Sequence, residues 1–426
     1  MKNIPEILIK KAQELEERTA KRFPKLAPLM KQCFLNTIET TVEQLDDGSY
    51  FVITGDIPAM WLRDSAAQVK PYIKCAKESE EVREIIRSVI AKHAFYVNID
   101  PYSNAFNASD SGRETPFEDH SDFKSGYIWE RKYEVDSISA SLYLAYEYYT
   151  ATEDKLIFTD SLHGMIKRIH DTFKAEQNHD KTTYFFLRGD DVDQYGGRGA
   201  PVKQGIGLTW SFCRPSDDGC IYGYLIPANM MASVALGYGE ELARIGWQDE
   251  ELAAQCLALS KEIREAIEKY GVIEHPKYGK IYAYETDGFG NYNLMDDANS
   301  PSLMSIPYIG YLPVDDEVYQ NTRRFILSKD NPHFYEGKVA KGVGSPHTPY
   351  NYIWHIALSM QALTSIDDAE IQYCMDAIAA SHAGTNYMHE SFNVDDPTEF
   401  TRPWFAWANT LFAQTVETVL DREEGK

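Results

Sequence analysis

The feature that most constrains the fold is an alternation, along the chain, between two kinds of apolar pattern with helical period. In the first kind, apolar residues recur at three- and four-residue steps, so they share one face of a helix. Such helices are amphipathic, and we expect each to have one face in water. The pattern predicts amphipathic helices over Pro5–Arg22, Pro28–Leu45, Glu81–Val97, Lys155–Phe173, Glu250–Tyr270, Asp315–Leu327 and Asp367–Ser381.

The second kind of segment is apolar on nearly all sides. A helix of that composition is expected to be buried rather than to face solvent. Each such segment follows a long connection rich in Gly, Asp and Tyr, and in five of six cases a short turn and an amphipathic helix come next. The predicted buried helices are Trp61–Ala76, Glu134–Tyr149, Ile221–Leu242, Ser300–Tyr311, Tyr350–Leu363 and Pro403–Leu420.

Six helical hairpins, with the long connections all on one side, predict an all-α fold: an (α/α)6 barrel whose inner helices start from the long loops. An irregular multi-helix protein is the alternative. Loops of such length inside a compact domain usually carry function, so we expect an active site at the long-loop face. No Pro/Ser-rich linker divides the chain, and residues 1–426 are expected to form a single domain. The connections are Asp46–Met60, Asn98–Tyr133, Ala175–Cys220, Gly271–Asn299, Ser328–Pro349 and His382–Arg402.

The charge balance argues against two classes of partner. The chain has 42 Lys plus Arg and 65 Asp plus Glu, a formal net charge of −23. Such a protein would repel the phosphates of a nucleic acid and the surface of an anionic membrane. The sequence has no apolar run of membrane-spanning length, and Met1–Arg22 shows no signal-peptide pattern. Six cysteines without a CxxC pair fit reduced thiols, so we expect a cytoplasmic protein; the oligomeric state stays open.

Familiar cofactor motifs are absent from the sequence. It has no GxxxxGK[ST] phosphate loop, no complete dinucleotide fingerprint and no GxSxG nucleophile motif. Its eleven histidines form no HExxH motif or other close ligand pair, and no cysteine cluster joins them. We therefore expect neither a cofactor nor a metal.

The first long loop ends in an Arg–Asp pair beside a tryptophan, within the sequence TGDIPAMWLRDS. Arg63 offers a planar fork of donors, Asp64 an acceptor and Trp61 an apolar face. Together these suit a polyhydroxylated ring, which needs polar contacts at its edge and stacking on its C–H face. The plainer alternative is that Asp64 caps the helix while Arg63 makes an ordinary ion pair.

The second and third loops repeat this combination at a predicted helix start. Trp129 and Glu130 stand side by side, a few residues before Asp136, whose simplest role is helix capping. Arg214 precedes the adjacent aspartates of RPSDDG, of which Asp218 is the second. Two aspartates before a glycine are also common in turns. Binding and structural interpretations both stay open here.

The last two long loops add a histidine and an isolated glutamate. His347 lies among Gly and Pro residues and could bond a sugar hydroxyl, although a lone histidine is more often structural. Glu390 lies between aromatic and neutral polar residues, where partial desolvation would raise its pKa or make it a strong base. Glycoside hydrolysis needs two carboxyl groups, one to protonate the leaving oxygen and one to activate water or attack carbon. It is therefore the leading hypothesis.

Five motifs resemble glycoside hydrolase family 125: TGDIPAMWLRDSAAQ, SGYIWERKYEVDS, TWSFCRPSDD, GVGSPHTPYNYIW and NYMHESF. The resemblance implies an (α/α)6 barrel and a bacterial, metal-independent exo-α-1,6-mannosidase that inverts the anomeric centre. It implies that Asp218 is the general acid and Glu390 the general base. We hypothesise that the subsite for the terminal mannose is lined by Asp56, Trp61, Arg63, Asp64, Trp129, Glu130, Arg214 and His347.

The expected substrate is an α-1,6-mannosyl oligosaccharide of N-glycan type, trimmed at its non-reducing end. One alternative is another inverting (α/α)6 glycosidase or phosphorylase, such as a glucoamylase-like enzyme. A sugar 2-epimerase shares the barrel but would rely on histidine pairs, which these motifs lack. A non-catalytic glycan-binding protein is the alternative from a different class.

Overall fold

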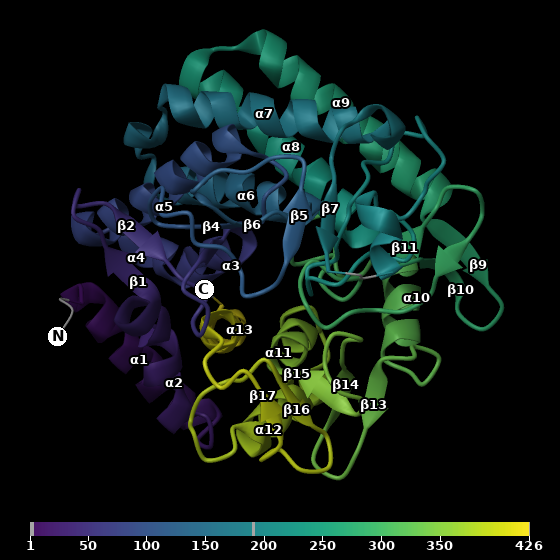
Figure 1. Cartoon of the computed structure of the whole chain (residues 1–426). Helices are drawn as coiled ribbons and strands as arrows, with labels where there is room; N and C mark the ends of the chain where they lie inside the picture. The colour runs from purple at the N-terminus through teal and green to yellow at the C-terminus, as the bar shows by residue number, and fades with distance from the viewer. Residues whose placement is uncertain (1–3, 190–191, 426) are drawn as a thin grey trace.

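The inner wall of the protein is formed by the helices predicted to be buried. The computed structural model describes residues 4–189 and 192–425. Figure 1 shows the inner helices around the centre of the molecule, where α3 contacts α6, α6 contacts α8, and α13 contacts both α11 and α3. Their bounds are α3 Leu62–Val69, α6 Val135–Thr152, α8 Ile226–Trp247, α11 His355–Leu363 and α13 Ala406–Glu424.

The amphipathic helices form the outer layer, as predicted, and each buries one face against the inner wall. In α7, for example, Leu162, Met165 and Ile169 are buried at three- and four-residue spacing. This arrangement is the predicted (α/α)6 barrel (Figure 1). The outer helices are α1 Glu6–Arg22, α2 Ala27–Asn36, α5 Glu80–Ile99, α7 Asp160–Glu176, α9 Glu250–Tyr270, α10 Glu317–Ile326 and α12 Asp368–Ser381.

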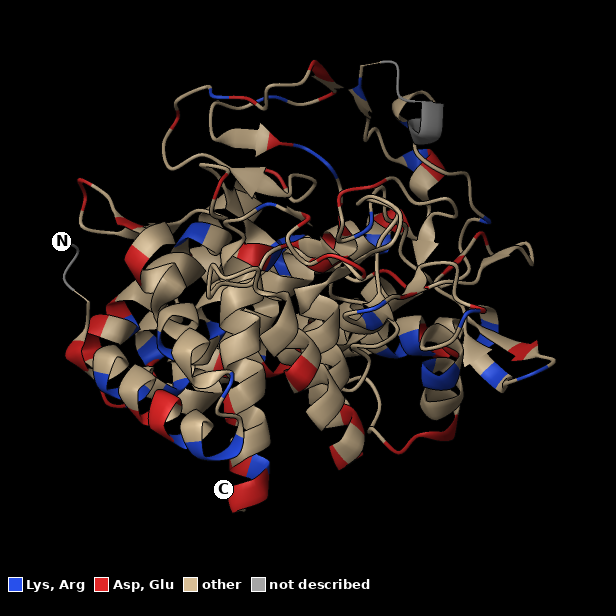
Figure 2. Ribbon diagram, turned by 90° about the horizontal axis from the view of Figure 1, so that it is seen from below, with Lys and Arg blue, Asp and Glu red and all other residues tan. Residues whose placement is uncertain are grey.

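The long connections gather at one end of the barrel, above the helices in Figure 2. These connections are predicted as long loops without regular elements, but they contain short antiparallel strands. In three cases a three-stranded sheet leads into an inner helix, because one of its strands ends where that helix begins. These sheets are β3-β4-β6 (Met60–Trp61, Ala105–Phe106, Ile128–Glu130), β8-β11-β12 (Tyr224–Leu225, Glu285–Thr286, Tyr292–Asn293) and β15-β16-β17 (Tyr352–Trp354, Ser391–Asn393, Phe400–Thr401).

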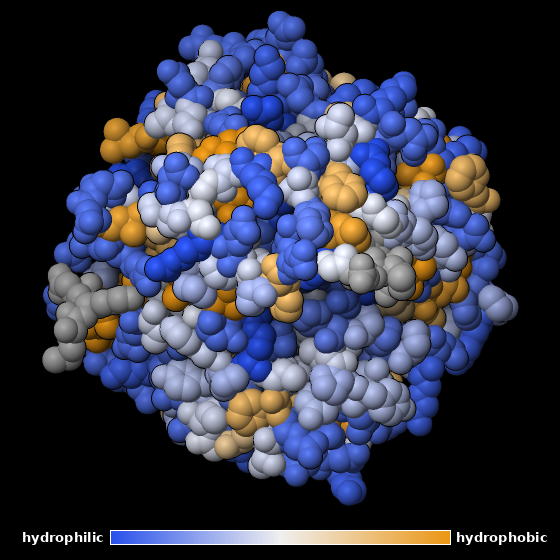
Figure 3. Space-filling view, in the orientation of Figure 1, coloured by the Kyte–Doolittle hydropathy of each residue, from blue (hydrophilic) through white to orange (hydrophobic). Residues whose placement is uncertain are grey.

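Two-stranded sheets complete the loop region and its margins. They pair β1 with β2 (Val42–Gln44, Tyr50–Val52), β5 with β7 (Asp119–Ser121, Phe186–Arg188), β9 with β10 (Val272–His275, Gly279–Tyr282) and β13 with β14 (Phe334–Glu336, Lys341–Val343). Figure 3 views the loop end of the barrel and shows a mainly hydrophilic surface with scattered apolar side chains.

One predicted inner helix is wrong. Ser300–Tyr311 forms successive turns rather than a helix. Two of its first N–H groups are taken by one side chain, since Asp296 accepts from Leu303 and from Met304 at 2.8 and 3.1 Å. Pro307 has no N–H, and Gly310 has φ +75°. The segment still contributes to the wall, because Tyr143 of α6 donates its hydroxyl to the Ile309 carbonyl at 2.6 Å.

Some predicted boundaries also differ from the observed ones. The helix predicted over Pro28–Leu45 ends at Asn36, and a five-residue π-helical turn and strand β1 follow. Thr40 donates its hydroxyl to the Asn36 carbonyl at 2.6 Å, a back-bond that disfavours continuation of the helix. Pro71 interrupts the helix predicted over Trp61–Ala76 with a 3-10 turn.

Inner and outer helices begin in different ways. Most outer helices start at a polar cap: the side chains of Ser79, Thr159 and Asp249, for example, each accept an N–H from the first turn. Most inner helices instead leave a strand or bridge directly, and α6 starts a few residues after β6. Their N-cap residues are Trp61, Glu134, Leu225, Trp354 and Phe405, and within the described residues none of these side chains makes a capping hydrogen bond. The first N–H groups of these helices donate to the loops instead: the Leu62 N–H bonds to the Asn104 carbonyl at 3.2 Å and the Ile226 N–H to the Tyr284 carbonyl at 2.9 Å. The positive dipole ends of the inner helices therefore face the loops.

An asparagine at the same position of α8 and of α13 fastens a loop to the barrel. Asn229 accepts the Thr209 N–H at 2.8 Å and donates to the Thr209 and Leu225 carbonyls, both at 2.9 Å. In α13, Asn409 accepts the Met388 N–H at 2.9 Å and donates to the Met388 and Phe405 carbonyls. Each asparagine is buried four residues after the helix N-cap, so both loops are held in register with the helices that they lead into.

We predict that Asn229→Ala lowers the free energy of unfolding by about 2–4 kcal/mol, because the Thr209 N–H and carbonyl would stay buried without partners. Urea denaturation followed by circular dichroism measures the effect. As a control, Gln255→Ala on the exposed face of α9 should change stability by less than about 0.5 kcal/mol. If Asn229→Ala is as stable as this control, the hydrogen bonds of Asn229 do not hold the third loop as described.

Candidate active site

A pocket with an empty volume of about 340 Å³ lies among the loops, where the inner helices begin. Five of the residues that the sequence analysis singles out line it: Trp61, Arg63, Asp64, His347 and Glu390. The other lining residues are Thr54, Ile57, Pro215, Ser216, Asp217, Asn299, Trp354, Arg402 and Phe405. Segments more than 300 residues apart in the sequence thus meet around one cavity.

Glu390 is buried and held from two sides. The Thr401 hydroxyl donates to Glu390 Oε2 at 2.9 Å, and Arg402 Nη1 donates to Oε1 at 3.4 Å. Arg402 is in turn fixed by both carboxylate oxygens of Asp56, through Nε at 3.1 Å and Nη2 at 2.5 Å. Asp56 therefore does not line the pocket itself but holds Arg402, which does. The sequence analysis does not single out Arg402, because nothing local marks its pairing with a residue of the first loop.

Asp218 lies in a tight turn that a backbone hydrogen bond closes. In this bond the Arg214 N–H donates to the Asp218 carbonyl, with a nitrogen-to-oxygen distance of 2.8 Å. Its two carboxylate oxygens each have one cationic donor. His347 Nδ1 lies 2.9 Å from Oδ1, and Arg214 Nη2 lies 3.2 Å from Oδ2. Of these three residues, His347 lines the pocket. Asp218 lies behind it in contact with His347, and Arg214 contacts Asp218.

The His347–Asp218 contact changes the pKa of both groups in opposite directions. Burial alone would raise the pKa of Asp218, but the hydrogen bond and charge of His347, together with Arg214, hold it below its ordinary value. Burial alone would lower the pKa of His347, yet the bond to Asp218 and the charges of Asp217 and Glu390 raise it to about 9. At neutral pH the contact is therefore an imidazolium–carboxylate pair.

Beside the pocket, Arg63 gathers acidic groups from two inner helices. Its Nη1 lies 2.6 Å from Glu134 Oε2 and 2.8 Å from Asp136 Oδ2, and its Nη2 lies 3.6 Å from Asp64. All four side chains are buried. Asp136 is thus an ion-pair partner rather than a cap, and Asp64 does not cap α3, whose N-cap is Trp61.

This cluster holds more negative than positive charge, and burial makes that costly. Burial raises the pKa of Asp64 to about 6, against the opposing charge of Arg63. Burial also raises the pKa of Glu134 well above its ordinary value. Burial opposes ionisation of Asp217 too, but the charges of Lys132 and Arg63 and the neighbouring Glu134 lower its pKa to about 2. The environments of Glu134 and Asp217 thus move their pKa values in opposite directions.

Trp129 and Glu130 lie beside the pocket rather than on its wall. Trp129 packs against the small cluster of Ala59, Trp61 and Ala105. Glu130 accepts from Arg188 Nη2 at 2.5 Å and from Asn104 at 2.9 Å, and it lines a neighbouring pocket with Trp129. The predicted direct contact of these two residues with a sugar in the 340 Å³ pocket is therefore not supported by their positions.

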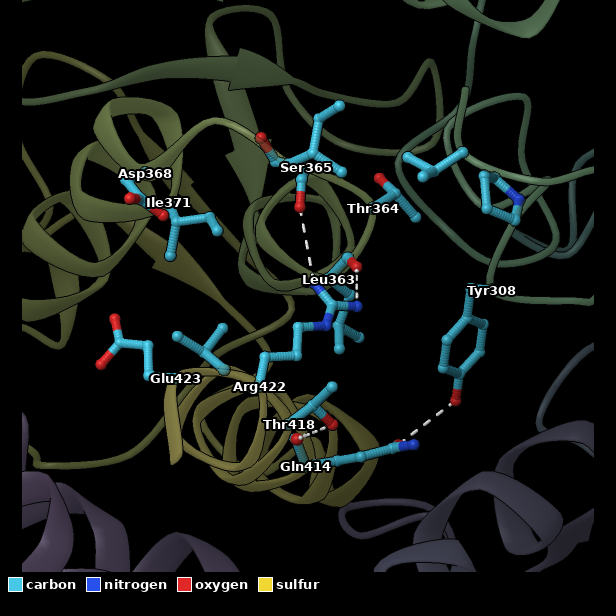
Figure 4. A pocket seen from close by; sticks show the side chains of 14 residues that line it. Tyr308, Leu363, Thr364, Ser365, Asp368, Ile371, Gln414, Thr418, Arg422 and Glu423 are labelled. Atoms are coloured by element: carbon cyan, nitrogen blue, oxygen red, sulfur yellow. Dashed lines mark hydrogen bonds between the residues drawn. The ribbon is translucent and has the colours of Figure 1, made fainter. Parts of the chain in front are cut away.

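A larger pocket, with an empty volume of about 1,400 Å³, lies at the opposite end of the barrel (Figure 4). It lacks the pairing of carboxyl groups found among the loops. Its central cation, Arg422, donates to the carbonyls of Leu363 and Ser365 at 2.7 and 3.4 Å, and so satisfies the C-terminal end of α11. We interpret this pocket as structural.

Within residues 4–189 and 192–425, no group of three or more His, Cys, Asp or Glu side chains is arranged to hold a metal ion. Over the same ranges, no helix is both long and apolar enough to span a bilayer.

Residues 24–417 match the protein family described as metal-independent alpha-mannosidase (GH125). The chain belongs to this family. A solved structure from Streptococcus pneumoniae, described as a metal-independent alpha mannosidase in a non-productive complex with alpha-1,6-mannobiose, is 45% identical. It has a TM-score of 0.95, with 99% of this chain and 100% of that chain covered.

Other relatives widen the comparison. The meiotically up-regulated gene 157 protein of Schizosaccharomyces pombe is 39% identical over 427 residues, which are 93% of this GH125 chain and 83% of the yeast protein. Since relatives occur in a bacterium and in a yeast, family membership does not support the expected bacterial source. A bacterial glucoamylase bound to acarbose has a TM-score of 0.57 at 14% identity, covering 85% of this chain and 50% of its own. That likeness shows the fold alone.

Asp64 should make the stability of this GH125 protein depend on pH in a defined direction. Its pKa rises from 3.8 to about 6 in the folded chain, so the folded state binds the proton more tightly than the unfolded state does. The resulting stabilisation is complete below about pH 4 and is lost as the pH rises through about 6. Asp64→Asn removes the titration. We expect the unfolding free energy of the variant, minus that of the wild type, to rise by about 2 kcal/mol between pH 4 and pH 7.

Urea denaturation of the two proteins at pH 4, 5, 6 and 7 measures this difference. The comparison between variant and wild type cancels the titration of other groups. Parallel pH profiles for the two proteins would show that Asp64 titrates normally.

Proposed function

We propose that this GH125 protein is an inverting exo-α-1,6-mannosidase that releases terminal mannose from α-1,6-mannosyl oligosaccharides of N-glycan type. The observation that carries the proposal is the meeting of Glu390 and the His347–Asp218 pair at one pocket. The α-1,6-mannobiose bound by the related S. pneumoniae protein supports the linkage.

In this proposal Asp218 protonates the glycosidic oxygen and Glu390 takes a proton from the attacking water. Glu390 suits the base role because it is buried and its two oxygens accept from Thr401 and Arg402, which orient it. Water attack from the face opposite the leaving group inverts the anomeric carbon, so no covalent intermediate with the protein is needed.

The pocket side chains supply the contacts that a mannose ring requires. Trp61, Trp354 and Phe405 offer apolar surface for the C–H face of the ring. Arg63, Asp64 and His347 offer donors and acceptors for hydroxyl groups. We propose that Asp56 and Arg214 act indirectly, by fixing Arg402 and Asp218, and that Trp129 supports Trp61 from behind.

The whole chain is proposed to act as one catalytic domain, since one large hydrophobic cluster includes buried residues from Leu8 to Leu420. We also propose a cytoplasmic location, consistent with six cysteines that are all free and buried. An α-glucosidase specificity of the glucoamylase type is the second candidate, supported by the shared barrel alone. Comparing hydrolysis of α-1,6-mannobiose and isomaltose separates the two.

We predict that Asp218→Asn and Glu390→Gln each reduce hydrolysis of α-1,6-mannobiose by about 100- to 10,000-fold, the range that general acid–base groups contribute. Both variants should keep the circular dichroism spectrum of the wild type and bind mannobiose in calorimetry. Asp315→Asn and Glu265→Gln, at exposed sites, are the matched controls and should retain full activity. Wild-type hydrolysis by either test variant would remove that residue from the mechanism.

The stereochemistry is predicted as well. Proton NMR during hydrolysis of α-1,6-mannobiose should show β-mannose as the first-formed anomer, because water replaces the leaving group from the opposite face. The α-anomer should appear later, at the rate of mutarotation. Initial release of α-mannose would indicate a retaining mechanism instead.

A further inference from the structure

The arrangement around Asp218 raises a problem for a group that has to donate a proton. A general acid must be protonated when the glycosidic bond breaks. In the free protein, however, both oxygens of Asp218 already accept from cations: His347 Nδ1 at 2.9 Å and Arg214 Nη2 at 3.2 Å. The carboxyl group therefore rests as a carboxylate, and the nearest transferable proton lies on the imidazole nitrogen.

Among these two cationic partners, only one can release a proton. The guanidinium of Arg214 stays charged in proteins, whereas an imidazolium titrates near the physiological range. Arg214 is also buried and lies 3.9 Å from Asp297, which fixes it as a permanent charge. The His347 side chain is 37% exposed, so solvent can return a proton to it after each turnover.

The surroundings of His347 favour its charged form from several sides. On the third loop it faces Asp218 and Asp217, and across the pocket it faces Glu390. The cations that bear on Asp218 from the other side are Arg214 and Lys132. On its own loop, the His347 N–H donates to the Ser345 hydroxyl at 3.2 Å, and its ring lies edge-on to Trp354 with centroids 6.4 Å apart. The loop is thus fixed with Nδ1 directed at Asp218.

We propose that His347 is the positioning residue that stores the catalytic proton for Asp218 and delivers it when the substrate is bound. The inference rests on the proposed mannosidase function and extends it to a residue that the family resemblance treats as a sugar contact. It also explains why the proposed acid, unlike the proposed base Glu390, is paired with a histidine.

Every proton in the proposed hydrolysis step is accounted for. The proton on His347 Nδ1 moves to Asp218, and Asp218 passes it to the glycosidic oxygen as the bond from that oxygen to the anomeric carbon breaks. The water oxygen forms the new bond to that carbon, and Glu390 receives one water proton. His347 is left neutral and regains a proton from solvent, while Glu390 returns its proton to solvent. One water molecule is consumed.

The inference predicts the basic limb of the pH profile. With the proton held on His347, whose pKa is about 9, kcat/KM on α-1,6-mannobiose should fall only above about pH 9. In His347→Asn the proton has to reside on Asp218 itself, next to Arg214. The basic limb should then move by at least about 2 pH units toward acid, and kcat/KM at pH 7 should drop by about 100-fold or more.

A substrate with an activated leaving group separates proton delivery from structural damage. The leaving group of 2,4-dinitrophenyl α-mannoside departs without protonation, so we expect His347→Asn to lose less than about fivefold on it. His347→Gln should behave in the same way, and His120→Asn, at an exposed histidine of β5, is the control. Equal losses on both substrates, or an unmoved basic limb, would overturn the inference.

A second measurement needs no turnover. In ¹³C-histidine-labelled protein, the His347 signal, assigned by its loss in His347→Asn, should titrate near pH 9 in the wild type. In Asp218→Asn it should titrate at least about 2 pH units lower, because the hydrogen bond and charge of the partner are gone and only Asp217 and Glu390 still oppose burial. An unchanged titration would overturn the pairing while leaving the mannosidase proposal intact. A wild type that hydrolyses no α-1,6-mannobiose would overturn both.

Discussion

A buried guanidinium that cannot lose its charge determines how the floor of the site is built. Arg63 lies one residue into α3, and leaving it unpaired in the interior would be strongly destabilising. Glu134 and Asp136, at the start of α6, meet that need at 2.6 and 2.8 Å and thereby fix the ends of α3 and α6 relative to each other. Burial and the neighbouring carboxylates raise the pKa of Glu134, and close by the Lys132 ammonium donates to the Asp217 carbonyl at 2.8 Å. The turn that presents Asp218 is thus anchored to the barrel through this chain of contacts.

The barrel contributes its helix ends to the same site. Because the inner helices start without capping side chains in the described residues, their N-terminal N–H groups and positive dipole ends face the loops. Acidic groups in the first turns of α3 and α6 complement that field. Asn229 and Asn409 then tie the backbones of the third and sixth loops to α8 and α13. The fold therefore supplies both the electrostatic environment and the register of the loops that carry Asp218 and Glu390.

Periodicity predicted most of the barrel but not its exceptions. The outer helix Glu250–Tyr270 coincides with the prediction, because its one-sided stripe and its Asp249 cap are both local signals. Ser300–Tyr311 is equally apolar, yet two of its first N–H groups are taken by Asp296, a residue outside the predicted helix. Strands of two or three residues leave no readable alternation, so the small sheets at the helix starts could not be found from the sequence.

The site shows the same division between local and long-range information. Loop motifs identified residues at the pocket, including Trp61, His347 and Glu390. They could not identify Arg402, whose partner Asp56 is 346 residues away. Nor could they distinguish a pocket-lining residue from Glu130, which is turned toward Arg188. Sequence patterns mark unusual side chains, whereas the pairing that gives each one its role depends on contacts between loops.

Those pairings also bear on which carboxyl group acts as acid and which as base. Glu390 contacts an arginine, a cation that cannot release its proton to a neighbouring group. Asp218 is paired with an arginine on one oxygen and a histidine on the other. It is the carboxyl group with a titratable proton source in direct contact. We propose that this difference, a titratable proton donor in contact with one carboxyl group and not with the other, separates the acid from the base.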